Sequence, residues 1–270
     1  MTDRPVGGVD LPREAIISAA REVGDAALVK WRALQDGVAL NQWRKDDASL
    51  VSEVDIETDL RLKAMLGAID PAAGWLSEET ADDPARLACR HIWCVDPIDG
   101  TRDFLRGRDG WAVSIALVED GAPRFGVLYA PARDQLWVGE AGRGASMNGL
   151  PVRAGDRTAL SGARVPAFDL PKVDSDLAKV AQPNSIALRM AMVANNEADL
   201  VATLRWGFEW DVAAAALIAM EAGAVVTDAF GAPLMFNTPR AQAFGVIACV
   251  PGIHGATVDR LRARAEAMVA

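Results

Sequence analysis

Apolar residues recur at helical spacing in two stretches near the start of the chain. In residues 16–34 they fall at every third or fourth position, and in residues 56–68 at every fourth position. This period puts the apolar side chains on one face of an α-helix. The pattern therefore predicts two amphipathic helices, the second of which ends before Pro71. The polar segment 41–54 between them is expected to form a loop or an exposed hairpin.

Short apolar runs separated by turn residues follow in the middle of the chain. Residues 91–95 are typical of a buried strand that leads into an Asp-Pro-Ile-Asp turn. Three further runs, 112–118, 125–130 and 135–139, are separated by Glu-Asp-Gly and Pro-Ala-Arg-Asp, which favour turns. This spacing predicts an antiparallel meander.

Helical and strand patterns alternate in the second half of the chain. Helices are predicted at 184–194, 211–223 and 258–269, and strands at 199–204, 225–228 and 244–249. Helices and sheets that alternate in this way predict an α/β (α+β) layered sandwich. We expect a single unit over residues 1–270, made of an α+β half at 1–155 and an α/β half at 156–270.

Composition narrows the classes of function. The chain has 270 residues, of which 51% are hydrophobic and 24% charged, and its net charge is −9. This acidic balance argues against binding a nucleic-acid polymer through a basic surface. The first ten residues carry acids and no apolar core, and no apolar run reaches membrane-spanning length, so neither a secretory signal nor membrane insertion is expected. The three cysteines show no metal-ligand spacing, and we expect a cytoplasmic protein.

One acidic segment carries the strongest candidate chemistry. Residues 93–104 read Trp-Cys-Val-Asp-Pro-Ile-Asp-Gly-Thr-Arg-Asp-Phe, with Asp96 and Asp99 three residues apart. Close carboxylates repel each other, so a structural loop has little use for them. A hard divalent cation such as Mg²⁺ takes oxygen ligands and holds like charges together. The segment therefore predicts a metal site, with a solvated acidic turn as the alternative.

Four acidic residues stand where predicted strands end or helices begin: Glu78, Asp96, Asp99 and Asp211. Glu78 has a second explanation as one of several exposed acids, and Asp211 as the cap of its helix. Carboxylates that converge on one spot need cations, and two metal ions can share bridging acids. If the four converge, they form a divalent-metal centre suited to cleaving a phosphate ester.

Three segments resemble, in order, sequence blocks of the inositol monophosphatase superfamily of Mg²⁺-dependent, lithium-sensitive phosphatases. The segments are Ser77-Glu78-Glu79, Asp96-Pro97-Ile98-Asp99-Gly100-Thr101, and Trp210-Asp211 followed by Glu221-Ala222-Gly223. A weaker match, Thr58-Asp59, lies in the second predicted helix. The resemblance covers nearly the whole chain. It implies the sugar-phosphatase fold, a small phosphorylated metabolite as substrate and, as is common in the family, a homodimer.

The resemblance implies a metal-binding role for five residues. Two or three Mg²⁺ ions would be bound by the side chains of Glu78, Asp96, Asp99 and Asp211 and by the backbone carbonyl of Ile98. Asp211 would bind a second metal. The ions would polarise a phosphoryl oxygen, lower the pKa of a bound water and neutralise the leaving oxygen.

The resemblance assigns catalysis and phosphate binding to neighbouring groups. Thr101, supported by Glu78, would orient the attacking water. Asp59 would help to orient Thr101 or a water on the metal. The backbone amides of Gly100 and Thr101 would face the phosphate. No covalent phospho-enzyme is implied.

The segment Glu209-Trp210-Asp211 resembles the 3′(2′),5′-bisphosphate nucleotidase branch of the superfamily, and so does the run 185–189. This resemblance favours adenosine 3′,5′-bisphosphate as the substrate, with Ser185, Glu209 and Asp211 on the substrate side. Inositol-1-phosphate, histidinol phosphate and fructose-1,6-bisphosphate are the alternative substrates.

The nucleotide hypothesis requires a cationic partner for the phosphate that stays on the product. The candidates in this half of the chain are Lys172, Arg189 and Arg205. A homologue that binds metal and phosphate without catalysis is an alternative of another class. Mg²⁺-dependent release of phosphate from a generic ester separates an enzyme from such a homologue.

Overall fold

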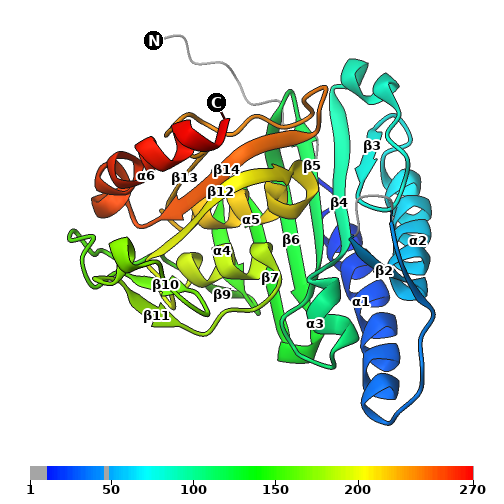
Figure 1. Cartoon of the computed structure of the whole chain (residues 1–270). Helices are drawn as coiled ribbons and strands as arrows, with labels where there is room; N and C mark the ends of the chain where they lie inside the picture. Colours follow the sequence, from blue (N-terminus) through cyan, green and yellow to red (C-terminus); the bar gives the residue numbers. More distant parts are fainter. Residues whose placement is uncertain (1–10, 46–48, 270) are drawn as a thin grey trace.

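The computed structural model describes residues 11–45 and 49–269, and its largest layer is a seven-stranded sheet (Figure 1). The strands follow in chain order as β3 (Gly74–Ser77), β4 (His91–Asp99), β5 (Ala112–Glu119), β6 (Ala122–Ala130), β7 (Gln135–Glu140), β8 (Gly144–Met147) and β9 (Leu150–Pro151). β3 is parallel to β4, and the other neighbours are antiparallel. The predicted meander is confirmed.

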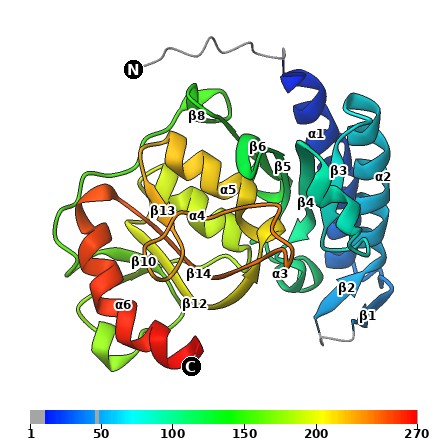
Figure 2. The same ribbon diagram turned by 90° about the horizontal axis from the view of Figure 1, so that it is seen from above.

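Helices cover both faces of this sheet (Figure 2). One face carries α1 (Arg13–Gln35) and α2 (Glu53–Ile69), and the other carries α4 (Ile186–Ala194) and α5 (Glu209–Glu221). Side chains alternate along β4, because successive residues of a strand point to opposite faces. Trp93 and Val95 pack in the core under α1 and α2, whereas Cys94 packs in the core under α4 and α5.

A three-stranded sheet lies on the far side of α4 and α5 (Figures 1 and 2). It is formed by β12 (Leu200–Phe208), β14 (Gln242–Cys249) and β13 (Val225–Thr227), in that spatial order. Its outer face is covered by α6 (His254–Val269). The described chain thus stacks a helix pair, a sheet, a helix pair, a sheet and a helix, and the predicted layered sandwich is confirmed. The division into two halves at residue 155 stays a prediction.

Short elements complete the described chain. They are the hairpin of β1 (Gln42–Arg44) and β2 (Leu50–Ser52), the parallel pair β10 (Arg164–Pro166) and β11 (Ala178–Val180), α3 (Thr101–Leu105), and 3₁₀ turns at Pro84–Ala88, Pro131–Arg133, Lys172–Asp174 and Pro251–Ile253. Within the segment 41–54, which was expected to be a loop or an exposed hairpin, β1 is exposed and pairs with β2, which is largely buried. Residues 46–48 lie outside the described part, and Glu53 and Val54 already belong to α2. None of the described helices is both long and apolar enough to cross a membrane.

The ends of two helices bear on the site. Ser185 is the N-cap of α4, as the sequence predicts, and its hydroxyl accepts the N–H of Leu188. In contrast, α5 begins two residues before the predicted start. Its N-cap is Phe208, which makes no side-chain capping bond, and Asp211 is the third residue of the helix. Asp211 is therefore not the N-cap residue, although its carboxylate accepts the backbone N–H of Phe208.

Glycines in the large sheet let α5 pack directly on the strands. A Cβ at Gly126 in β6 would lie 2.9 Å from the carbonyl oxygen of Ala214, and one at Gly139 in β7 would lie 3.0 Å from the Cα of Ile218. The residues of α5 that face the core are mainly alanines, so the helix backbone itself meets the sheet. This contact lets α5, which carries Asp211 in its first turn, lie directly on the strands.

Replacing Gly126 with alanine should lower the free energy of unfolding by about 1–3 kcal/mol, because the added methyl has no room beside α5. Gly67 in α2 is the matched control, since its Cβ would meet nothing within 4 Å. Gly67→Ala should raise the free energy of unfolding by about 0.5–1 kcal/mol. Urea denaturation measures both. Equal effects at the two positions would contradict the close packing of α5.

Candidate metal centre

Three carboxylates from separate parts of the chain meet at one point. Glu78 follows β3, Asp96 lies in β4, and Asp211 lies in the first turn of α5. One carboxylate oxygen of each lies within 4.8 Å of the others. The parallel pairing of β3 with β4 places Ser77 beside Val95, and so brings Glu78 next to Asp96. Asp211 belongs to the later half of the chain. The packing of α5 across β4, β5 and β6 brings it to the other two carboxylates.

Burial and mutual repulsion oppose the negative charges of this cluster. Burial, followed by the charges of Glu78, Asp99 and Asp211, holds the pKa of Asp96 well above its usual value. Burial and the charges of Asp99 and Glu78 also hold the pKa of Asp211 well above its usual value. A set of oxygen donors that repel one another fits a hard divalent cation such as Mg²⁺, which offsets the repulsion when it binds.

A lysine that the sequence analysis did not single out also reaches the cluster. Lys45 follows β1 and places Nζ 2.7 Å from Glu79 Oε1 and 3.3 Å from Glu78 Oε1. Burial raises the pKa of Glu79 to about 7, against the lowering effect of its hydrogen bond with Lys45. The contact joins residues more than 30 positions apart, and the polar pattern of segment 41–54 gave no sign of it.

Asp99 and Ser185, two further predicted site residues, contact each other. The hydroxyl of Ser185 and the backbone N–H of Ala187 both donate to Asp99 Oδ2, the latter at 2.8 Å. Ser185 is fully buried. The structure therefore places Ser185 behind Asp99 and not on an open substrate surface, which corrects the sequence-based expectation. Its hydroxyl orients a carboxylate of the predicted metal site.

The hydroxyl of Thr101 lies against Asp55. Thr101 is the first residue of α3; it donates to Asp55 Oδ1 at 2.9 Å and lies 3.1 Å from the carbonyl oxygen of Ile98. The other carboxylate oxygen of Asp55 accepts the N–H and the hydroxyl of Ser52, and this forms the capping box of α2. Burial raises the pKa of Asp55, so its carboxylate is a stronger base than an exposed aspartate.

Asp59, which was expected beside Thr101, has other partners. It lies one helical turn further along α2 than Asp55, and its carboxylate accepts the hydroxyls of Ser77 and Thr80. Those two residues flank Glu78 and Glu79, so Asp59 fixes the segment that carries Glu78. The expectation that Asp59 orients Thr101 is corrected by this geometry.

Glu209 and Gly100 also have definite places. The carboxylate of Glu209, which was expected on the substrate side, is buried and accepts hydrogen bonds from Asn237 and Thr238 within the protein.

Gly100 has a φ of +98°, and a Cβ there would lie 2.6 Å from the carbonyl oxygen of Gly110. Only glycine fits this turn between β4 and α3. That the amides after the turn face a phosphate stays a prediction.

Two of the three cationic candidates lie close to the carboxylates. Arg205 in β12 lines a small hollow with Asp211, and its charge acts to lower the pKa of that carboxyl against the larger effect of burial. Arg189 in α4 is held by the carbonyl oxygens of residues 183 and 184. The pKa of Arg189 is lowered, mainly by burial. The nearby charge of Asp99 acts to raise this pKa, and the charge of Arg205 acts to lower it. The third candidate, Lys172, is exposed in a 3₁₀ turn.

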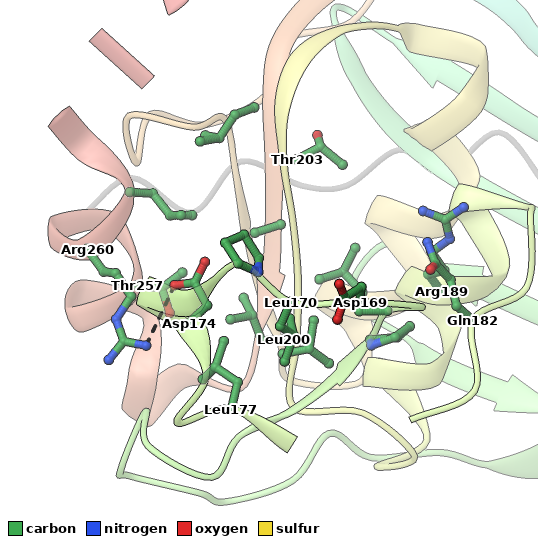
Figure 3. A pocket seen from close by; sticks show the side chains of 18 of the residues that line it. Asp169, Leu170, Asp174, Leu177, Gln182, Arg189, Leu200, Thr203, Thr257 and Arg260 are labelled. Atoms are coloured by element: carbon green, nitrogen blue, oxygen red, sulfur yellow. Dashed lines mark ion pairs between the residues drawn. The ribbon is translucent and has the colours of Figure 1, made fainter. Parts of the chain in front are cut away.

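Arg189 also lines a cavity of about 460 Å³ (Figure 3). Gln182 and Arg189 stand at one end of it, and Arg260, paired with Asp174, at the other, with apolar side chains between them. Thr203 lines both this cavity and the small hollow that contains Asp211. The cavity therefore adjoins the small hollow that Asp211 lines.

Known proteins match both the sequence and the fold. Residues 12–249 match the inositol monophosphatase family. The Nus factor SuhB of Xylella fastidiosa is 32% identical over 251 residues, which cover 87% of this chain and 86% of that protein. The inositol-1-monophosphatase of Rhizobium meliloti is 33% identical over 207 residues, which cover 69% of this chain and 75% of that protein. The structure of the IMPase of Thermotoga maritima matches with a TM-score of 0.79 at 26% identity and covers 93% of this chain and 97% of that one.

These matches confirm the superfamily that the three sequence blocks predicted, and with it the fold. They also confirm that the chain is of a phosphatase family that acts on small phosphorylated molecules and typically uses Mg²⁺. The homodimer, the cytoplasmic location and the lithium sensitivity stay predictions.

Asp96→Asn should raise the melting temperature of the metal-free protein near neutral pH, because it removes a repelled, buried charge. The raised pKa of Asp96 means that its contribution to stability is full below the usual aspartate pKa and is lost as the pH rises through the raised pKa. The variant should therefore lose less stability than the parent as the pH rises. It should also lose the stabilisation by Mg²⁺. Calorimetry with EDTA or Mg²⁺ measures each effect.

The matched control for this measurement is Asp199→Asn, at another buried aspartate. The Asp199 carboxylate is paired with Arg164, which lowers its pKa despite burial. This variant should lower the melting temperature near neutral pH and keep the response to Mg²⁺. A response to Mg²⁺ that survives Asp96→Asn would show that Asp96 is not a ligand.

Proposed function

The chain belongs to the inositol monophosphatase family, whose members are phosphoric monoester hydrolases, and on that premise we propose that it removes phosphate from a metabolite carrying a second anionic group. Adenosine 3′,5′-bisphosphate is the substrate that we favour. The supporting observation is the pair Arg189 and Arg205, which lie beside the carboxylates of a protein whose net charge is −9. A guanidinium fork suits a phosphate that stays on the product.

The chain's oxygen donors would hold the metal. We propose that Glu78, Asp96, Asp99 and Asp211, with the carbonyl of Ile98, bind two or three Mg²⁺ ions. The clustering of three of these carboxylates supports this assignment. When bound, the ions polarise the phosphate and lower the pKa of a water molecule.

Thr101 and Asp55 would position the attacking water. Because Thr101 donates its proton to Asp55 Oδ1, its oxygen keeps lone pairs that can accept a hydrogen bond from water. The proton of the water can pass through Thr101 Oγ1 to Asp55, whose pKa burial raises into a range more suited to a base. Asp55 thus takes the part of orienting Thr101 that the sequence analysis gave to Asp59.

The remainder of the substrate would extend away from the carboxylates. We propose that the amides of Gly100 and Thr101 bind the reacting phosphate and that Arg205 binds the retained one. The cavity lined by Arg189 lies within the size range of small-molecule sites, and its lining is largely apolar. A nucleobase fits such a lining better than a polyhydroxylated ring does, which supports the nucleotide.

Inositol-1-phosphate is the second candidate substrate. It is favoured by the inositol-1-monophosphatase of Rhizobium meliloti, to which this chain is 33% identical. Glu209 offers no direct contact that would favour the nucleotide over inositol-1-phosphate, because its carboxylate accepts hydrogen bonds within the protein. The two esters differ in charge, so replacing an arginine near the carboxylates can distinguish which of them is the substrate.

Thr101→Ala should lower kcat by about 10²-fold or more, because the water loses the group that orients it. The charges of the cluster are unchanged, so Mg²⁺ should still bind and raise the melting temperature. Thr101→Ser keeps the hydroxyl and should recover much of the rate. Steady-state kinetics at saturating Mg²⁺ give the comparison. Equal activity of the alanine and serine variants would remove Thr101 from the mechanism.

Adenosine 3′,5′-bisphosphate should exceed inositol-1-phosphate in kcat/KM by at least about tenfold, which corresponds to about 1.4 kcal/mol. Arg205→Ala should lower the value for the nucleotide by about tenfold and leave that for inositol-1-phosphate within about twofold. Arg262→Ala, at an exposed position in α6, removes the same charge and should change neither. Phosphate release under one Mg²⁺ concentration measures all three proteins.

Two contrary outcomes would overturn different parts of the proposal. A preference for inositol-1-phosphate would overturn the nucleotidase proposal and leave the phosphatase intact. Release of phosphate from no ester, in the presence of Mg²⁺, would identify a non-catalytic homologue.

A further inference from the structure

Glu209 begins α5 as a buried carboxylate tied to a distant loop. It is 1% exposed, and Oε2 accepts the backbone N–H of Asn237 at 2.6 Å. Oε1 accepts the backbone N–H of Thr238 at 3.0 Å and the hydroxyl of Thr238 at 2.5 Å. Each carboxylate oxygen is therefore used within the protein, and the first turn of α5 is fastened to segment 236–238.

Arg86 fastens the same segment to the other half of the molecule. Its side chain is 2% exposed, and Nη1 donates to Asn237 Oδ1 at 2.7 Å while Nη2 donates to the carbonyl oxygen of Thr238 at 3.0 Å. Asn237 Nδ2 in turn donates a hydrogen bond to the carbonyl oxygen of Arg86 at 3.1 Å. Asp82 pairs with the guanidinium from the solvent side at 2.6 Å.

This connection reaches the large sheet at two points. A Cβ at Gly74 in β3 would lie 2.8 Å from the Cβ of Arg86, so Arg86 sits directly on the strand that leads to Glu78. The backbone N–H of Phe236 donates to the carbonyl oxygen of Gly121, in the turn between β5 and β6. Segment 236–238 is thus anchored to the sheet and to α5 together.

The bonds to Glu209 support the start of α5 from outside the helix. The N-cap Phe208 stacks its ring on Trp210 but makes no side-chain capping bond, so its side chain gives the first turn no hydrogen bond. Asp211 lies two residues after Glu209 in that turn. Glu78 lies in the loop that continues to Asp82 and Arg86. The same connection therefore adjoins two carboxylates of the metal centre, one from each half of the chain.

We infer that Arg86, Asn237, Thr238 and Glu209 form a clamp that sets the position of Asp211 relative to Glu78 and Asp96. These are positioning residues, since none of them touches the carboxylate cluster. The inference rests on the proposed role of Asp211 as a metal ligand. Loosening the clamp should weaken metal binding more than a comparable change elsewhere, because outer hydrogen bonds set the geometry of metal ligands.

Asn237→Gly is the test variant. Asn237 has a φ of +58°, which glycine adopts freely, so the substitution removes both side-chain bonds to Arg86 and keeps the backbone. Asn148→Gly is the matched control. Asn148 has a φ of +50°, and its side chain likewise makes one accepted and one donated bond, to Leu136 and Asp134, in a hairpin outside the cluster.

Calorimetric titration of the metal-free proteins with Mg²⁺ gives the readout. Asn237→Gly should raise the Kd for Mg²⁺ by about tenfold, and Asn148→Gly should leave it within about twofold, although both lower the melting temperature. Thr238→Val removes only the hydroxyl bond to Glu209 and should raise the Kd by about threefold. It provides the test if Asn237→Gly does not fold.

Asp211→Asn separates the clamp from the proposed function. If Asp211 is a ligand, this variant alone weakens Mg²⁺ binding, and adding Asn237→Gly to it should cause little further loss, because the clamp acts through Asp211. Unchanged binding in Asp211→Asn would overturn the metal assignment. Weakened binding in Asp211→Asn with unchanged binding in both Asn237→Gly and Thr238→Val would overturn the clamp, as would an equal effect of Asn148→Gly.

Discussion

Repulsion between buried carboxylates is the constraint on which the rest of this structure depends. Glu78, Asp96 and Asp211 cannot approach one another unless something else holds their backbones in place. The parallel pairing of β3 with β4 holds the first two, and the packing of α5 on the sheet holds the third. The stabilising contacts lie in the hydrophobic layers, and the unfavourable charges are confined to one point where a cation can offset them.

A second layer of hydrogen bonds stands behind the carboxylates. Ser185 donates to Asp99, and Ser52 donates to Asp55, which in turn accepts the hydroxyl of Thr101. Asp59 fixes the segment on either side of Glu78. Such bonds limit the rotamers of the groups that would meet metal and substrate. The centre is therefore held in shape before any ligand arrives, which is how a site acts on a transition state without reorganising.

The sequence predicted the elements and the cluster better than it predicted the supporting contacts. Helical and alternating periods placed the layers, and local motifs placed Glu78, Asp96 and Asp211, because both kinds of signal are short in range. The partner of Thr101 is Asp55, 46 residues away, whereas the sequence analysis gave that part to Asp59. The local signal for Asp55 is the Ser-x-x-Asp capping box of Ser52 and Asp55 that begins α2.

Helical phase explains the expectation for Glu209. Residues two apart on a helix point about 200° apart, so Glu209 and Asp211 cannot both face the metal centre. Their neighbouring letters in the sequence suggested a shared role, whereas the structure gives them opposite directions. Asp211 lies in the carboxylate cluster, whereas Glu209 accepts hydrogen bonds from segment 236–238.

The close packing of α5 on Gly126 and Gly139 has a consequence for how this protein can change over time. Where the helix backbone contacts the strand backbone, a larger side chain lowers the stability of the fold. The contact positions of α5, the helix that carries Asp211, therefore tolerate little variation. The lining of the cavity at residues 165–177 belongs to short elements and connecting segments, which tolerate replacement far better. With the substrate in the cavity as proposed, selection can therefore alter which molecule is recognised while the residues around Asp211 are kept.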